Sequence, residues 1–233
     1  MPRTARGIVG GYCYHLLNRS NGRRRIFHDN NDYASFVALI AKAQDDIPVD
    51  VLAACLMPNH VHLVLRPQAG KDLARWAHWI FTSHVRRHHR KYSTEGRIWQ
   101  GRFKASVIQQ DRHLLTVLRY VERNALSAKL VAKAEAWRWG SLNWRLRTDP
   151  PVSLVESPAV MPSNWVQYVN EPQSLEELAE LRSAVGRERP YGTAEWVAIT
   201  ARELGFTYSI TPRGRPRKNA LPVESAWPLA AEK

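Results

Sequence analysis

The strongest constraint on the fold is an apolar hairpin whose second arm begins with two histidines. Residues 49–57 and 60–66 form two apolar runs with a Pro-Asn pair between them. Two short apolar runs joined by turn residues are typical of a β-hairpin. Because side chains alternate faces along a strand, His60 and His62 are expected on one face and the apolar residues that follow each of them on the other. The sequence therefore predicts an antiparallel sheet that carries an imidazole pair opposite its core face.

The histidine pair has two interpretations. Two imidazoles on one face of a strand are half of a divalent-metal site. The alternative is a pair of solvated polar side chains on an exposed sheet face. The spacing of His60 and His62 alone leaves both interpretations open.

The flanking sequence predicts the remaining elements of one α+β unit. We expect a strand over residues 9–18, and a loop at 97–109 that leads into another strand. Apolar residues at helical spacing predict helices over 30–44, 71–91 and 112–127, with Asp29 or Asn30 capping the first and Asp111 the last. In the last helix, Tyr120 and Asn124 are four residues apart and are expected on the same face.

The charge distribution predicts a polyanionic partner. The formal net charge is +13, and the segment from Lys71 to Lys104 holds nine Lys or Arg against two Asp or Glu. Such clustering favours a nucleic-acid surface over mere solubility. The same segment contains His84 and His88, which are four apart and offer a second candidate metal pair, for which zinc is the natural ion. The plainer interpretation is a basic helix end that faces phosphate.

The character of the chain changes after Ser127. Helices are expected at 174–186 and 193–204, and a helix-turn-helix is an alternative for that pair. An extended basic run follows at 212–218; it fits a minor groove or a phosphate track, or else is a disordered tail. The two cysteines are expected to be buried thiols. No apolar run approaches the roughly 18 residues of a spanning helix, and the N-terminus is unlike a signal peptide, so we expect a cytoplasmic protein.

Four stretches together resemble the single-tyrosine branch of the HUH endonuclease superfamily. They are Tyr14-His15-Leu16-Leu17-Asn18-Arg19, the Met57 to Leu65 segment, Trp99 to Phe103, and Tyr120-Val121-Glu122-Arg123-Asn124. Their order and chemistry are similar to the REP-associated tyrosine transposases of bacteria, which act on single-stranded DNA. The likeness covers roughly residues 8–128, and the basic run near the C-terminus is similar to the same subgroup.

The resemblance implies a fold and a set of roles. The fold would be a ferredoxin-like α+β domain with an antiparallel sheet and packed helices. His60 and His62 would be metal ligands, and Tyr120 would be the nucleophile that forms a 5′-phosphotyrosine. Asn124 stands where relatives place a third, amide ligand, often Gln; both amides offer a carbonyl oxygen to a hard cation. The metal would be Mg²⁺ or Mn²⁺, between which this ligand set does not choose.

The resemblance also implies a substrate, namely single-stranded DNA beside short imperfect hairpins. Unpaired bases can be splayed out and stacked on aromatic or guanidinium groups. The residues expected to contact this DNA are basic or aromatic: Arg19, Arg23, Arg24, Arg86, Arg87, Arg90, Lys91, Trp99, Arg102, Lys104, Arg213, Arg215, Arg217 and Lys218.

These expectations divide the chain into three parts: an HUH domain at 1–130, a helical appendage at 131–211 and a basic, largely disordered tail at 212–233. The resemblance places the protein at the bacterial nucleoid and favours a monomer, although related transposases pair. One alternative function is a hairpin-binding protein that keeps the scaffold without catalysis. A further alternative is a zinc protein that uses His84, His88 and neighbouring histidines.

Overall fold

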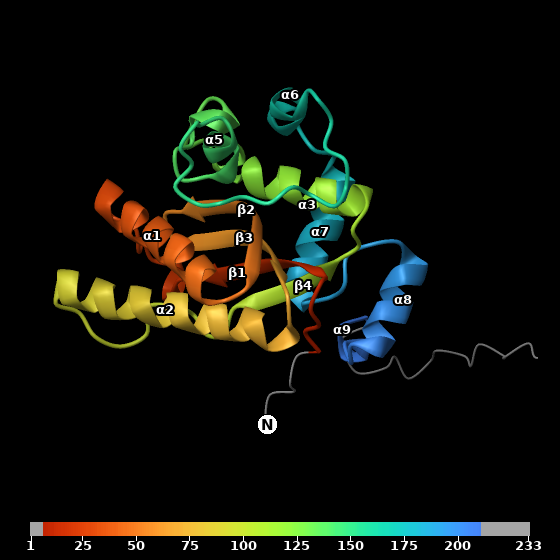
Figure 1. The fold of residues 1–233 in the computed structure, drawn as a ribbon, viewed down its shortest axis with the longest axis horizontal. Helices are drawn as coiled ribbons and strands as arrows, with labels where there is room; N and C mark the ends of the chain where they lie inside the picture. The colour runs from red at the N-terminus through yellow and green to blue at the C-terminus, as the bar shows by residue number, and fades with distance from the viewer. Residues whose placement is uncertain (1–6, 211–233) are drawn as a thin grey trace, which may run out of the picture.

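The computed structural model describes residues 7–210, and these form an α+β fold built on one antiparallel sheet (Figure 1). The sheet of the described residues has four strands: β1 (Cys13–Arg19), β2 (Val49–Met57), β3 (His60–Pro67) and β4 (Lys104–Ile108). Their spatial order is β2-β3-β1-β4, and every neighbouring pair is antiparallel. With a helix after β1 and another after β3, this is the ferredoxin-like arrangement that the sequence predicted.

Two helices cover one face of the sheet. They are α1 (Asn30–Asp46) and α2 (Gly70–Tyr92), which lie side by side in Figure 1. Asp29 begins α1 because its carboxylate accepts the Asp32 N–H, which would otherwise lack a partner in the first helical turn. The fully buried Phe36 of α1 and Trp76 of α2 face the apolar side of the sheet. Burial of each such side chain contributes roughly 1.5–3 kcal/mol, so this face forms the main core.

Helices that follow the sheet in sequence cover the opposite face (Figure 1). They are α3 (Arg112–Glu122), α4 (Asn124–Ser127), α5 (Ser141–Arg145), α6 (Trp165–Asn170) and α7 (Leu175–Arg187). Buried Val117 and Val121 of α3 pack with Cys55 of β2, and Leu181 of α7 joins the same cluster. The appendage therefore shares a core with the sheet, while the predicted boundary near residue 130 stays a prediction.

The helix expected over 112–127 is divided at Arg123, which corrects that prediction. α3 ends at Glu122 and α4 begins at Asn124. The division coincides with two side chains that turn to the appendage: Glu122 receives hydrogen bonds from α5 and α6, and the Arg123 guanidinium donates to the Val169 carbonyl. Tyr120 and Asn124 thus lie on consecutive helices. Arg123 between them keeps right-handed helical backbone angles and donates its N–H to the Arg119 carbonyl oxygen, so the expectation that they share a face stays a prediction.

The C-terminal elements largely match their predictions. α8 (Ala194–Glu203) is capped by Thr193, and Gly205 follows it with a positive φ of 70°, a left-handed conformation that glycine adopts without steric cost. α9 (Thr207–Ile210) packs on α8, whereas α7 packs on β4, so the two predicted helices do not form a compact pair of their own. Two 3₁₀ turns, η1 (Asn21–Arg23) and η2 (Ala134–Ala136), complete the described elements.

Three smaller expectations have clear outcomes. Cys13 and Cys55 are buried free thiols, as predicted, and burial raises the pKa of each to about 12. No helix among residues 7–210 combines the length and apolar composition that crossing a membrane requires. The predicted tail at 212–233 lies outside the described residues, and with it Arg213, Arg215, Arg217 and Lys218.

Candidate active site

The histidine pair lies at the start of β3, on the face of the sheet that α3 covers. In the register, His60 stands opposite Arg19 of β1, and His62 stands between Leu17 of β1 and Cys55 of β2. Val61, Leu63 and Leu65 belong to the other core, beneath α1 and α2. The alternation expected from the sequence is therefore confirmed.

Tyr120 meets the histidines from α3. Its ring centroid lies 5.6 Å from that of His62, with the two rings nearly perpendicular, and the His60 and His62 centroids are 4.9 Å apart. The neighbouring Val121 and Val117 anchor α3 in the core. The fold thus brings together a phenol and two imidazoles from elements that are about sixty residues apart in the chain.

Each histidine uses its Nδ1 atom in a hydrogen bond. His62 Nδ1 lies 2.8 Å from Nε2 of His15, and His60 Nδ1 lies 2.6 Å from Oδ1 of Asn59. No described residue hydrogen-bonds to Nε2 of His60 or of His62. Nε2 is therefore the ring nitrogen that each imidazole leaves without a hydrogen-bond partner among the described residues, and so the one that could bind a ligand.

Burial keeps these imidazoles neutral. It lowers the pKa of His15 to about 3 and, together with the positive charge of Arg19, the pKa of His60 to about 4. The pKa of His62 lies well below its ordinary value, first through burial and then through neighbouring histidines and Arg19. Metal ligation by histidine needs the neutral ring, so the pair is in the required protonation state at neutral pH.

The two histidines need further ligands to complete a metal site. Among residues 7–210, no three His, Cys, Asp or Glu side chains gather as a metal-binding group. An amide oxygen is one further kind of protein ligand for a hard cation. Asn124 opens α4 immediately before Ala125, which is buried in the same cluster as Cys55, the β2 neighbour of His62. If the Asn124 amide joins them, two neutral imidazoles and one carbonyl oxygen form a donor set that suits a Mg²⁺ or Mn²⁺ ion with open positions.

The zinc alternative needs further ligands beside His84 and His88. The ring centroid of His84 lies 5.3 Å from those of Phe27 and Phe36, and 5.2 Å from that of Trp99, so this histidine is a core residue. His88 lies beside it on α2, with 5.9 Å between the two centroids. Within the described part of the chain, no three His, Cys, Asp or Glu side chains around this pair are placed so that they could hold a metal ion.

A basic turn borders the histidines. The Asn59 side-chain amide donates to the Arg23 carbonyl oxygen over 2.9 Å, and the Ser20 N–H donates to the Asn59 carbonyl oxygen over the same distance. The turn that carries Arg23 and the exposed Arg24 is thus fixed next to His60. Arg19, at the end of β1, stands opposite His60 in the register. Three of the predicted DNA-binding residues therefore lie at the site.

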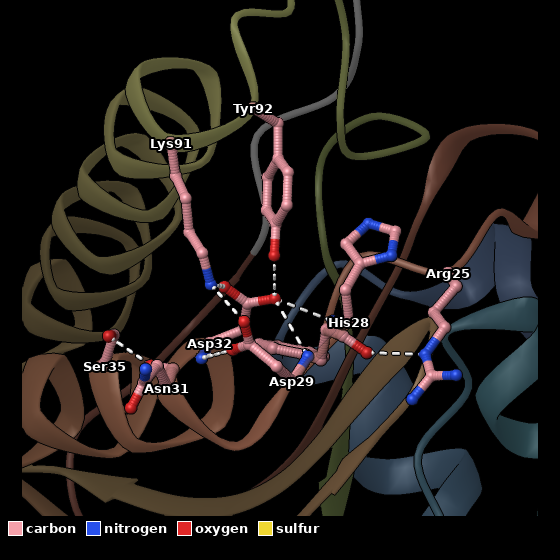
Figure 2. A network of polar contacts seen from close by, with 9 residues as sticks. Arg25, His28, Asp29, Asn31, Asp32, Ser35, Lys91 and Tyr92 are labelled. Carbon is pink, nitrogen blue, oxygen red and sulfur yellow. Dashed lines mark hydrogen bonds and ion pairs between the residues drawn. The ribbon is translucent and has the colours of Figure 1, made fainter.

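Other predicted DNA-binding residues have different surroundings. Arg86, Arg87 and Arg90 are exposed on α2. Lys91 instead forms ion pairs with Asp29 at 2.7 Å and Asp32 at 2.6 Å, in the network of Figure 2 that ties the end of α2 to the start of α1.

Trp99, Arg102 and Lys104 follow α2 in the chain. The indole of Trp99 is only 6% exposed and packs edge-on against Phe81. Trp99 and Arg102 both line a cavity of about 690 Å³ between α2 and the loop before β4, on the α1 and α2 side of the sheet. The Lys104 ammonium donates to the Gly186 carbonyl oxygen over 2.9 Å.

Two residues of the site escaped the sequence reasoning: His15 and Asn59. Both stand in stretches that carry the family resemblance, yet neither had an assigned role. For His15 the sequence signal was partial: alternation along the first strand separates it from the core residues Tyr14 and Leu16, but does not place it beside the histidine strand. For Asn59, the signal was its position immediately before His60 in a tight turn.

Comparisons with known proteins agree with this geometry. The family model described as "Transposase IS200 like" matches residues 9–124, about half of the chain. A Haemophilus influenzae protein assigned as a REP-associated tyrosine transposase is 26% identical over 113 residues. That match covers 44% of this chain and 64% of the relative, so the chain spans less than two thirds of the length of that curated protein.

A solved structure supports the fold. It is described as a REP-associated tyrosine transposase bound to a REP hairpin, and its superposition gives a TM-score of 0.51 with 16% sequence identity. The match covers 75% of this chain and 99% of that one. At this identity the likeness supports the architecture alone. His60, His62, Tyr120 and Asn124 all fall within the matched range of the family model, and through residues 9–124 this chain belongs to the IS200-like transposase family.

Proposed function

We propose that this protein is a metal-dependent endonuclease and strand-transferase that cuts single-stranded DNA beside REP-like hairpins. The observation that carries the proposal is the meeting of Tyr120 with His60 and His62 at one end of the sheet. A protein that merely binds DNA has no need for a phenol beside two imidazoles with unused Nε2 atoms. The family membership and the basic border of the site support the same reaction.

In this reaction, the Tyr120 oxygen attacks the phosphorus of the scissile phosphodiester. The bond between phosphorus and the tyrosine oxygen forms, and the bond between phosphorus and the 3′ oxygen breaks. The phenolic proton is lost, and the departing 3′ oxygen gains one to become a hydroxyl. The phosphate stays on the 5′ end of the downstream strand, where it forms an ester with the tyrosine. A 3′-hydroxyl can later attack this ester, which reverses the reaction and joins strands.

The proposed metal ligands are His60, His62 and Asn124. A bound Mg²⁺ or Mn²⁺ ion would polarise the phosphate and offset negative charge in the transition state. The contribution of the chain is to keep both imidazoles neutral, with His62 buried and His60 partly buried, and to hold the phenol of Tyr120 beside them. Because free tyrosine has a pKa near 10, the phenol needs this assistance to act as a nucleophile at neutral pH.

The proposed partner is hairpin DNA with unpaired bases at its foot. Arg19, Arg23 and Arg24 stand at the site and are proposed to hold the scissile strand. The exposed arginines of α2 are proposed to contact the backbone, and the cavity lined by Trp99 and Arg102 offers an apolar place for an unpaired base. The structural relative that was solved with a REP hairpin supports this choice of DNA.

The test is a covalent-capture assay. Purified protein is mixed with end-labelled hairpin DNA from beside its own gene, with Mn²⁺, Mg²⁺ or EDTA, and is run on a denaturing gel. We expect a metal-dependent protein–DNA band from the wild type and from Tyr208→Phe, a matched control at an exposed tyrosine, but none from Tyr120→Phe. Normal hairpin binding without any covalent band in the wild type would favour the non-catalytic alternative.

A further inference from the structure

The hydrogen bonds at Nδ1 of His60 and His62 determine which ring nitrogen of each histidine can bind a ligand. A histidine can bind a metal through Nε2 only when that atom carries a lone pair, which in the neutral ring requires the hydrogen on Nδ1. The partner of each Nδ1 therefore matters as much as the histidine itself. This argument rests on the proposed function, since it concerns the same metal site.

Asn59 defines the state of His60. Its side-chain nitrogen donates to the Arg23 carbonyl oxygen, an atom that can only accept. The other end of the same amide, Oδ1, must then be the atom that lies 2.6 Å from His60 Nδ1. Because Oδ1 can only accept, His60 carries its hydrogen on Nδ1 and leaves a lone pair on Nε2. The Asn59 side chain thus fixes both the tautomer and the orientation of the ring.

His15 contacts Nδ1 of His62, as Asn59 contacts Nδ1 of His60. If His15 Nε2 donates, then His62 holds its hydrogen on Nε2 and cannot bind a metal there. If His62 Nδ1 donates to His15 Nε2 instead, the His62 Nε2 lone pair becomes available. Only the second arrangement is compatible with ligation, so the role of His15 is to accept a hydrogen bond from His62.

The surroundings of His15 shield its bond to His62 from solvent. Its side chain is 1% exposed, and its Nδ1 atom has no hydrogen-bond partner among residues 7–210. It lines a small pocket together with Val117 of α3, Leu181 and Ala184 of α7, and Tyr191. In a pocket closed in this way, water cannot easily compete for the bond between the two imidazoles.

We infer that His15 and Asn59 are positioning residues, which accept hydrogen bonds from His62 and His60 and thereby direct both Nε2 lone pairs toward a divalent metal ion. Neither residue touches the metal or the DNA in this role. Since α7 encloses His15, the inference also gives the appendage a part in building the site, although α7 lies beyond the residues that define the family.

The experiment is a Mn²⁺ titration of the full chain without DNA, followed by electron paramagnetic resonance of the free ion. His15→Leu removes the acceptor, whereas His15→Gln places an oxygen the same number of bonds from Cβ as Nε2. Asn59→Leu and Asn59→Asp form the same pair at the other histidine. We expect each Leu variant to bind Mn²⁺ about 10–100-fold more weakly, and each acceptor-keeping variant to stay within a few-fold of wild type.

The outcomes separate this inference from the proposed function. Wild-type affinity in both Leu variants would overturn the inference while leaving the metal site in place. Equal losses in Leu and acceptor-keeping variants would show a packing role and would also overturn it. If the wild type binds Mn²⁺ no better than a His60→Ala, His62→Ala double variant, the metal site itself fails, and the inference fails with it. Thermal unfolding identifies a variant that has not folded. If His15→Leu does not fold, the comparison of Asn59→Leu with Asn59→Asp tests the inference instead.

Discussion

Replacing Glu122 should cost the protein a large part of its stability. The Glu122 side chain is fully buried, and it lies two residues after Tyr120, at the end of α3. One carboxylate oxygen accepts from the Ser141 hydroxyl at 2.6 Å and from the Arg145 guanidinium at 2.9 Å. The other accepts from the Trp165 indole at 2.6 Å. A single carboxylate therefore connects the helix of the proposed nucleophile to α5 and α6.

The expected magnitude follows from these three bonds. A hydrogen bond to a charged group contributes about 1.5–3 kcal/mol. Adding three such contributions would overestimate the cost of Glu122→Ala, because a donor that loses its partner can still bind water. Arg145 keeps 19% of its side-chain surface exposed and can still reach water. Removing one partner of a buried ion pair costs about 3–5 kcal/mol, which is the loss that we expect. Glu122→Gln should lose about 2–3 kcal/mol, because its amide N–H groups would face the indole N–H.

Urea unfolding followed by tryptophan fluorescence measures these losses. Glu203→Gln, at an exposed position of α8, is the matched control and should change the free energy of unfolding by less than about 0.5 kcal/mol. A loss below about 1 kcal/mol for Glu122→Ala would refute the reasoning, since it would mean that the three donors find other partners at no cost.

Three further predictions concern α1 and α2. Burial lowers the pKa of His84 to about 3, so the folded state takes up its proton less readily than the unfolded chain, and stability should fall as the pH drops below 6.5. His84 should lower the free energy of unfolding by about 2 kcal/mol between pH 7 and pH 5, and His84→Leu should abolish that part of the decrease, as measured by urea unfolding at the two pH values. Arg90→Ala should weaken hairpin binding and reduce its salt slope by about 0.7–0.9, whereas Lys91→Ala, which breaks ion pairs with Asp29 and Asp32, should leave the slope nearly unchanged. Filter-binding titrations between 50 and 200 mM salt compare the two, and equal slopes for both variants would contradict the assignment. Asp29→Ala removes the α1 cap and should cost about 1 kcal/mol in urea unfolding; an unchanged midpoint would count against the cap.

The sequence predicted the sheet and its histidine face because both depend on local periodicity. Alternation in residues 60–66 separates His60 and His62 from the core side chains whatever the rest of the chain does. Helix boundaries near Asp29 and Gly205 were likewise set by local capping chemistry. The structure confirms these features. Tertiary contacts agree with the local preferences at these positions and do not override them.

What escaped prediction depends on contacts between distant residues. The pairing of His15 with His62 follows from β1 lying beside β3, and no local pattern specifies that neighbour. The ion pairs of Lys91 with Asp29 and Asp32, about sixty residues earlier, could not be predicted from its own neighbours in the chain, while its contact with phosphate stays a prediction. The division of the helix at Arg123 likewise depends on partners in α5 and α6.

The central claim is that Tyr120 becomes covalently attached to DNA, and mass spectrometry of the captured complex tests it most directly. Trypsin should release Tyr120 on the short peptide between Arg119 and Arg123, after nuclease has trimmed the DNA. We predict a 5′-phosphonucleotide on that tyrosine, formed only when Mg²⁺ or Mn²⁺ is present. A nucleotide on another residue, or a cut strand with no attached protein, would contradict the account.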